Sequence, residues 1–358
     1  MKVYLIQHTP TPHINEFLKS LKKEGFFYNV FYTKDLNNKQ EDDQVKYYNK
    51  DLDFKFIKKI ISLKESLIIV TGWMNINMII LNLYFFFFQK QFFYWSDRPK
   101  PSLSIFKSLK RKIYLNILKF SKVKILAVGN FAVSYFLEIG INKKRILNFP
   151  ICVNSNSNIL SLEHKINWRT SHFKGIEIDD FVISAGSRLE FEKGYDIMIK
   201  EFSKLNQNIK KNVKILLIGE GSEKKNLISL TNDLKISENI FFLGWKDIDS
   251  YKDIIASSDL FIHPARYDAY GASIYAFASG VPVLATLNSG ATIDRLKHSF
   301  NGFIFDDKID GDMSKYIELI YNDRRMLNNL SQNAYADSKT HQPIKLVIKL
   351  KDTWENLI

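Results

Sequence analysis

The loop from Gly186 to Gly194 carries the clearest chemistry in this sequence. It reads Gly-Ser-Arg-Leu-Glu-Phe-Glu-Lys-Gly, follows an apolar, strand-like segment and precedes a predicted helix. Arg188 and Lys193 therefore stand as two cations beside a helix N-terminus, an arrangement that favours phosphate oxygens. An arginine and a lysine in a loop are also often no more than solvated surface charges, so this prediction depends on the neighbouring segments.

Three other segments also place polar or glycine residues directly after a predicted strand. The first puts Gly219 in a turn before a helix, and the second puts Trp245 after an apolar run. The third, 263–283, carries Asp268 and Gly271 in a turn before a short helix. Each segment is a weak signal alone, but their order along the chain is informative.

The elements that must position these residues alternate between strand-like and helical patterns along the whole chain. This alternation predicts an α/β protein with two Rossmann-like, doubly wound parallel-sheet lobes that face a cleft, where a ligand would bind beyond the carboxyl ends of the strands. The expected division is an N-terminal lobe at 1–150, a linker at 151–176, a C-terminal lobe at 177–340, and a C-terminal helix at 341–358 for which a return to the N-terminal lobe is one option.

Composition excludes several classes of protein. The chain has 358 residues, of which 46% are hydrophobic and 14% aromatic, so it is not a disordered tail. Its one cysteine, Cys152, allows neither an intramolecular disulfide nor a cysteine zinc cluster, which favours a reduced, cytoplasmic location. The formal charge of +13 is uneven, since residues 1–150 hold 25 basic and 11 acidic side chains and the remainder is nearly neutral. An anionic partner for the N-terminal lobe is expected.

The uncharged run from Leu67 to Phe88 allows two interpretations. Its 22 residues are long enough to cross a bilayer. Thr71, Gly72 and the asparagines that follow instead split it into a strand, a polar turn and a helix, as in a buried parallel α/β unit. The second interpretation is favoured.

Nine lysines and arginines, with no acidic residue, lie between Arg98 and Lys124. Apolar residues at helical spacing separate them, which suits attachment to an anionic membrane surface and equally suits an ordinary amphipathic helix with a solvated face. No nucleic-acid reader motif accompanies the patch, so nucleic acid is not expected as a partner. The residues predicted for the membrane surface are Lys107, Lys110, Arg111 and Lys112.

The ordered motifs resemble the retaining, nucleotide-sugar-dependent glycosyltransferases of family four, which have the GT-B fold. The similarity covers most of residues 181–306 and includes Gly302, whereas residues 1–150 are similar only in their strand and helix pattern and in segments such as 95–97 and 127–129. The resemblance implies that residues 1–150 form an acceptor- and membrane-facing lobe and that residues 177–340 form the nucleotide-sugar donor lobe. The resemblance implies that Arg188 and Lys193 hold the donor diphosphate and that no metal or other cofactor is needed, with a UDP- or GDP-sugar as substrate. The donor residues it implies are Gly186, Arg188, Lys193, Gly219, Trp245, Asp268, Gly271, Ser273 and Tyr275.

This chain departs from the family pattern around the short helix. The family has two glutamates eight positions apart, whereas here Asp268 stands in the first place and the second glutamate is missing. Either the turn absorbs the loss, with Tyr275 or Ser273 contacting the ribose, or donor binding is damaged.

Acceptor residues are less well marked. His8 and His13 flank the end of the first predicted strand, and Asp97 follows another strand end. Each is equally well explained as an ordinary turn residue.

The expected function is therefore transfer, with retention, of a sugar from a nucleotide diphosphate to a surface glycan or lipid-linked saccharide, in lipopolysaccharide or capsule synthesis, at the inner face of the cell membrane. Asp268, Arg188 and Lys193 are the predicted catalytic residues. The alternative is a non-catalytic relative that acts as a binding protein.

Overall fold

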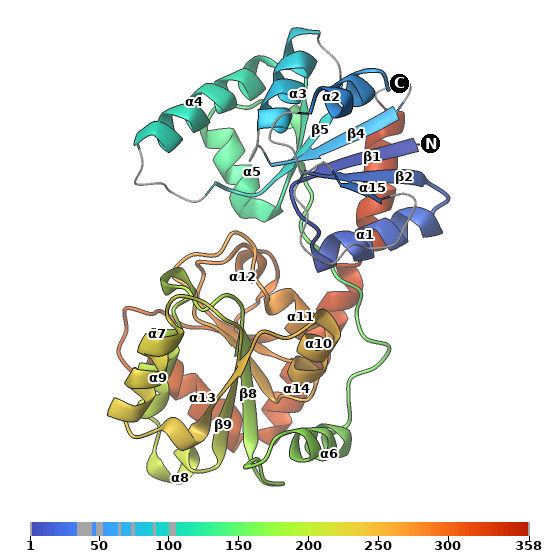
Figure 1. The fold of residues 1–358 in the computed structure, drawn as a ribbon. Helices are drawn as coiled ribbons and strands as arrows, with labels where there is room; N and C mark the ends of the chain where they lie inside the picture. Colours follow the sequence, from blue (N-terminus) through green and yellow to red (C-terminus); the bar gives the residue numbers. More distant parts are fainter. Residues whose placement is uncertain are drawn as a thin grey trace. The chain divides into compact units, whose positions relative to one another are not determined.

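Two parallel sheets organise the chain (Figure 1). The first compact unit comprises 1–152 together with 343–358, and the second comprises 153–342. The prediction of two doubly wound parallel α/β lobes is confirmed. The computed structural model describes residues 2–33, 45–47, 53–63, 66–72, 76–88, 91–99 and 105–356.

The sheet of the first unit has the order β3-β2-β1-β4-β5-β6-β7, with every pair parallel. The order reverses between β1 and β4, which is the position where open α/β sheets bind ligands. The strands are β1 (Lys2–Gln7), β2 (Phe27–Tyr32), β3 (Val45–Tyr47), β4 (Ser66–Thr71), β5 (Phe93–Ser96), β6 (Lys124–Ala127) and β7 (Ile146–Asn148).

Helices cover both faces of this sheet, as parallel strands require. Helices α1 (Pro12–Lys23) and α15 (Pro343–Glu355) pack together on one face. The other face carries α2 (Phe54–Ile61), α3 (Ile76–Phe87), α4 (Ile105–Phe120) and α5 (Gly129–Glu138), and the short helix η1 (Lys143–Arg145) precedes β7.

The uncharged run at 67–88 forms β4 and then α3, which supports the favoured interpretation. Within the described ranges, we find no helix with the length and apolar character needed to cross a membrane.

The sheet of the second unit has the order β10-β9-β8-β11-β12-β13 and reverses between β8 and β11. Helices α7, α9 and α13 line one face, α10 and α11 line the other, and α14 packs against both α11 and α13 (Figure 1). The strands are β8 (Phe181–Gly186), β9 (Val213–Ile218), β10 (Ile240–Gly244), β11 (Leu260–His263), β12 (Val283–Ala285) and β13 (Gly302–Ile304). The helices are η2 (Phe191–Lys193), α7 (Tyr195–Ser203), α8 (Gln207–Lys210), α9 (Lys224–Asp233), η3 (Ser237–Asn239), α10 (Ile248–Ala256), α11 (Ser273–Ala278), α12 (Gly290–Arg295), α13 (Asp312–Asn322) and α14 (Arg324–Thr340).

The predicted linker at 151–176 is wrong for much of its length, because it contains α6 (Leu162–His172). Ser161 caps this helix by accepting a hydrogen bond from the backbone N–H of His164. Polar contacts dock α6 on the second unit: Lys165 Nζ donates to the carbonyl of Ser258, and Arg169 lies 2.7 Å from Asp259. A helix held mainly by polar contacts shows little hydrophobic periodicity, which is why the sequence did not reveal it.

Candidate functional site

The reversal in strand order between β8 and β11 brings three side chains of the second unit together. Lys193 ends η2, the short helix that follows β8, and His263 is the last residue of β11. Asp268 lies in the turn after β11. All three therefore lie beyond the carboxyl ends of neighbouring parallel strands, where doubly wound folds bind their ligands.

Asp268 is the centre of this cluster. Its Oδ2 atom lies 2.6 Å from Nζ of Lys193 and 3.2 Å from Nε2 of His263, and all three residues are buried. Burial by itself would raise the pKa of Asp268, but the hydrogen bond and charge of His263 and the charge of Lys193 hold that pKa well below its usual range. Asp268 is therefore a carboxylate at neutral pH, and one oxygen makes both of its recorded side-chain contacts.

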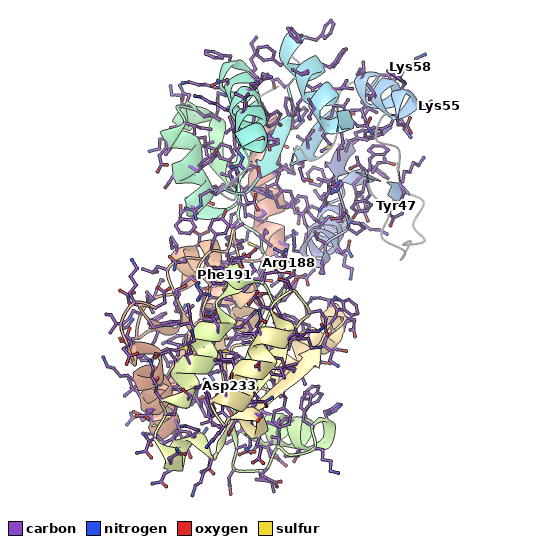
Figure 2. The ribbon with its side chains drawn as sticks, turned by 60° about the vertical axis from the view of Figure 1, so that its left-hand side comes forward. Tyr47, Lys55, Lys58, Arg188, Phe191 and Asp233 are labelled. Atoms are coloured by element: carbon purple, nitrogen blue, oxygen red, sulfur yellow. The ribbon has the colours of Figure 1, made fainter. Side chains whose placement is uncertain are left out.

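Arg188 is placed differently from Lys193. Its side chain is 71% exposed, and its one recorded ion pair is a long contact of 3.9 Å to Glu192. Figure 2 shows Arg188 with Phe191 at one end of the second unit, away from Asp233. The structure thus offers one buried, paired cation and one exposed cation in the same loop.

The glycines predicted for ligand approach are needed by the protein itself. A Cβ atom on Gly186 would lie 2.8 Å from Cβ of Ile218 on the neighbouring strand, and one on Gly219 would lie 1.9 Å from the carbonyl oxygen of Ser187. A Cβ atom on Gly271 would lie 2.2 Å from Cε1 of His263. Close packing of the loops against the strand ends therefore explains why glycine occupies all three positions.

The remaining predicted donor residues differ in exposure. Trp245 follows β10 and is 72% exposed, so its ring is open to a planar ligand. Ser273 and Tyr275 lie in α11 and are buried. The hydroxyl of Ser273 is itself buried and has no partner among the described residues, so contact with a ribose would require α11 to shift.

Two site residues were missed by the sequence analysis. His263 was treated only as a strand end, although an imidazole directly before Pro264 at the carboxyl end of a strand was a usable signal. Tyr251, on α10, donates a hydrogen bond of 2.8 Å to the carbonyl of Gly186, and its ring meets that of Tyr275 edge to face at 5.6 Å. Nothing in the local sequence of Tyr251 indicates this contact.

The first unit has a pocket of about 260 Å³ at the reversal between β1 and β4. All three predicted acceptor residues, His8, His13 and Asp97, line it. Burial lowers the pKa of His13 to about 4, so its imidazole is neutral at neutral pH. The structure thus brings together three residues that the sequence could only suggest separately.

The predicted membrane residues lie in α4, but the side chains of Lys107 and Lys110 lie outside the described part of the structure. Arg111 is partly exposed and Lys112 is exposed. On the same helix, Leu109, Ile113 and Phe120 are exposed by 55%, 55% and 73%.

No group of three or more histidine, cysteine, aspartate or glutamate side chains that could hold a metal ion occurs among the described residues. The cations predicted to face a phosphate, Arg188 and Lys193, both lie in the loop that follows β8.

Comparison with known proteins finds one matching family model. Residues 168–337 match the family model described as glycosyl transferases group 1. This segment contains the whole cluster around Asp268 as well as Arg188 and Trp245.

Curated relatives are similar over part of the chain. The lipopolysaccharide core biosynthesis glycosyltransferase LpsE of Rhizobium meliloti is 27% identical over 155 residues, which cover 43% of each chain. The O-antigen biosynthesis glycosyltransferase WclY of Escherichia coli is 28% identical over 172 residues, which cover 47% of this chain and 44% of the relative. The chain thus spans less than half the length of these curated relatives.

Solved structures show the same fold over nearly the whole chain. The crystal structure of Anabaena HepE in complex with UDP-glucose has a TM-score of 0.83 at 17% identity and covers 99% of this chain and 100% of its own. WaaG, a glycosyltransferase involved in lipopolysaccharide biosynthesis, has a TM-score of 0.72 at 13% identity, with 99% of each chain covered.

Proposed function

We propose that this chain, which is a group 1 glycosyltransferase with the GT-B fold, transfers a sugar from a nucleotide diphosphate donor to a hydroxyl of a surface glycan or lipid-linked saccharide, with retention of configuration. The observation that carries the proposal is the cluster of Lys193, His263 and Asp268, together with the exposed Arg188 in the same loop as Lys193. It combines cations for a diphosphate with a carboxylate for sugar hydroxyls. The crystal structure of Anabaena HepE, which has the same fold, is a complex with UDP-glucose, and this supports a nucleotide-sugar donor.

The donor diphosphate gains negative charge as its bond to the sugar breaks. Arg188 can reach it at little cost, because the side chain is largely exposed and has no close ion-pair partner. Lys193, which is buried and paired with Asp268, supplies the second positive charge. Fixed positive charge directed at a leaving group stabilises the transition state more than the ground state, so a metal ion has no required role in this proposal.

Asp268 orients the donor sugar in the same proposal. Its Oδ2 atom is held by Lys193 and His263, while no described residue makes a recorded hydrogen bond to Oδ1. An ionised carboxylate with one oxygen fixed can accept hydrogen bonds from sugar hydroxyls through the other. Trp245 offers a ring surface on which the nucleotide base can stack.

Helix α4 supports a membrane location for the acceptor. Tyr114 and Leu118 are buried, whereas Leu109, Ile113 and Phe120 lie on the opposite face of the helix, since successive residues turn by 100°. An ordinary amphipathic helix has one apolar face, while α4 has two. Exposed Lys112 and Lys119 flank the outer apolar face, which suits an anionic lipid surface.

A non-catalytic binding protein is the second candidate. Two features favour this candidate. The second glutamate of the family pattern is missing, and the hydroxyl of Ser273 is buried, so neither a glutamate nor Ser273 contacts the ribose. Losing one hydrogen bond to a charged group costs about 1.5–3 kcal/mol, which weakens donor binding without abolishing it.

The experiment mixes the purified protein with a panel of radiolabelled UDP- and GDP-sugars and a membrane lipid extract. We expect at least one donor to transfer its label to the lipid fraction. Binding of a nucleoside diphosphate without any transfer or donor hydrolysis would favour the second candidate.

A further inference from the structure

The second unit has a cavity of about 370 Å³ at the end of its sheet opposite to the carboxyl ends of the strands. Asp180 and Asp259 line it and directly precede β8 and β11, whereas Lys193 and Asp268 come after those strands. Asp259 and His263 stand at the two ends of β11, about 13 Å apart at ~3.3 Å per strand residue. The cavity is therefore separate from the cluster proposed to bind the donor.

The walls of this cavity are mainly aliphatic. Leu162 and Ile166 lie one turn apart on α6, and Leu327 lines the cavity from α14. Leu162 and Ile178 are exposed by 58% and 67%, which places them at the mouth. The apolar side chains of α6 thus border a space rather than a packed core, and the volume falls within the ~300–1,000 Å³ of small-molecule pockets.

Arg169 is one of two buried cations in the lining. It is 98% buried, and Asp259 balances its charge at 2.7 Å. A second N–H of its guanidinium donates to the carbonyl of Asp180 at 2.6 Å, but its buried Nε atom has no hydrogen-bond partner among the described residues. Buried donors are rarely left unpaired unless a ligand or water completes them.

Lys165 is the other buried cation, and it lacks a carboxylate partner. The residue is 93% buried, and its Nζ donates to the carbonyl of Ser258 at 2.8 Å. An ammonium group has three N–H donors, yet within the part of the chain that the structure describes Lys165 forms no ion pair. Burial lowers the pKa of Lys165, and the charge of Asp259 offsets this only in part. An anion beside Nζ would stabilise the charged form.

We propose that this cavity binds a small aliphatic carboxylate, with its chain between α6 and α14 and its carboxylate paired with Lys165, where it also completes the hydrogen bonds of Arg169. The aliphatic walls favour an apolar chain, and the unpaired ammonium favours an anionic head group. This inference does not depend on the proposed donor or acceptor.

The charges of the lining favour a single negative charge on the ligand. Arg169 and Asp259 neutralise each other, which leaves Lys165 as the buried cation without an ion pair. Asp180 is a further buried carboxyl, and it accepts a hydrogen bond from the N–H of Glu177 at 2.8 Å. A doubly charged phosphate would meet one unpaired cation and the repulsion of these carboxylates. The exposed charged residues of the lining are one acid and one base, Asp179 and Arg324.

The test uses calorimetry on the full chain with hexanoate, hexyl phosphate, 1-hexanol and hexylamine. We expect hexanoate to bind at least tenfold more tightly than each of the others, because it alone combines the chain with one negative charge. No binding of hexanoate, or equal or tighter binding of any of the other three, would overturn the proposal.

Dodecanoate distinguishes two sources of the same chemistry. Tighter binding than hexanoate would assign a fatty acid, and weaker binding would assign a short-chain acid. Either result agrees with a carboxylate site.

Variants locate the site. Lys165→Met keeps the length of the side chain and removes its charge, so it should weaken hexanoate binding at least tenfold and leave hexanol binding unchanged. Lys174→Met, at an exposed lysine just after α6 that does not line the cavity, is the matched control and should bind hexanoate normally. Unchanged hexanoate affinity in Lys165→Met would contradict the proposal. If this variant fails to fold, the comparison of the four ligands on the unmodified protein still decides.

Discussion

The Nζ atom of Lys193 lies 2.6 Å from Oδ2 of Asp268, although 75 positions separate the two residues in the chain. The first residue follows β8 and the second follows β11, so the reversal in strand order creates the pair. A donor that is to gain the charge of Lys193 must share this cation with Asp268. The pair contributes to the stability of the second unit, and in the proposed function it also places the donor.

The stability of this pair can be tested directly. Asp268→Ala leaves Lys193 buried without its partner, so we expect the free energy of unfolding to fall by about 3–5 kcal/mol. The double variant Lys193→Met/Asp268→Leu removes both charges and should recover much of that loss. Denaturant unfolding measures the free energy of unfolding of both variants. If the double variant loses as much stability as Asp268→Ala, the loss does not come from leaving the buried charge of Lys193 unpaired.

Arg188 should affect donor binding and leave stability unchanged. Its side chain is exposed, so Arg188→Ala removes no packing, but it deletes a charged donor to the diphosphate worth about 1.5–3 kcal/mol. We expect a tenfold to hundredfold weaker affinity for the nucleoside diphosphate, measured by calorimetry. Arg325→Ala, an exposed arginine on α14, is the matched control and should bind normally.

Gly271 has both a positive φ of 105° and no room for a side chain. In Gly271→Ala, the new Cβ would collide with the ring of His263 and displace it from Asp268, so we expect activity to be lost and the second unit to be destabilised by several kcal/mol. Gly311→Ala has a φ of 77° and open space around it, so it isolates the backbone cost of about 1–2 kcal/mol. Equal melting temperatures for the two variants would contradict the packing argument.

His13 should make the first unit lose stability in acid. Its pKa is lowered by burial to about 4, whereas an unfolded histidine titrates near 6.5. The unfolded state therefore binds more protons between these values, and the free energy of unfolding rises with pH by up to about 1.4 kcal/mol per unit, levelling off above about 6.5. Hydrogen exchange of the β1 amides, followed as a function of pH, measures this change in the stability of the first unit. His13→Gln should remove this part of the pH dependence.

Charge on the outer face of α4 should weaken membrane binding. Ile113→Glu places a carboxylate within the exposed apolar stripe, and we expect at least tenfold less protein to float with anionic vesicles. Ile309→Glu, at a residue 57% exposed in the second unit, is the control. Flotation that falls equally in both variants would assign the effect to net charge rather than to α4.

Local patterns were sufficient to predict most of the fold. The splitting of the run at 67–88 followed from its internal polar turn, and the strand ends near Arg188, Asp268 and Asp97 followed from alternation of strands and helices. Helix α6 was not predicted, because polar contacts hold it on the second unit and its sequence shows little hydrophobic periodicity. Contacts made across the chain, such as Tyr251 with Gly186 and Lys193 with Asp268, could not be predicted, because the order of strands in the second sheet decides them.

The glycines show a second limit of sequence reasoning. Gly186 was expected to make room for a ligand, yet the structure uses the missing side chain to pack β8 against Ile218. A sequence indicates that a side chain is absent, but it does not indicate which atom occupies the space.

The most direct test of the central claim is transfer of label from the best nucleotide sugar to the lipid fraction, compared among the unmodified protein, Arg188→Ala and Arg325→Ala. The account predicts product with the unmodified protein and with Arg325→Ala, and at least a tenfold smaller rate with Arg188→Ala. Equal rates in all three proteins would contradict the role given to Arg188, and the absence of both transfer and nucleotide binding would contradict the glycosyltransferase activity itself.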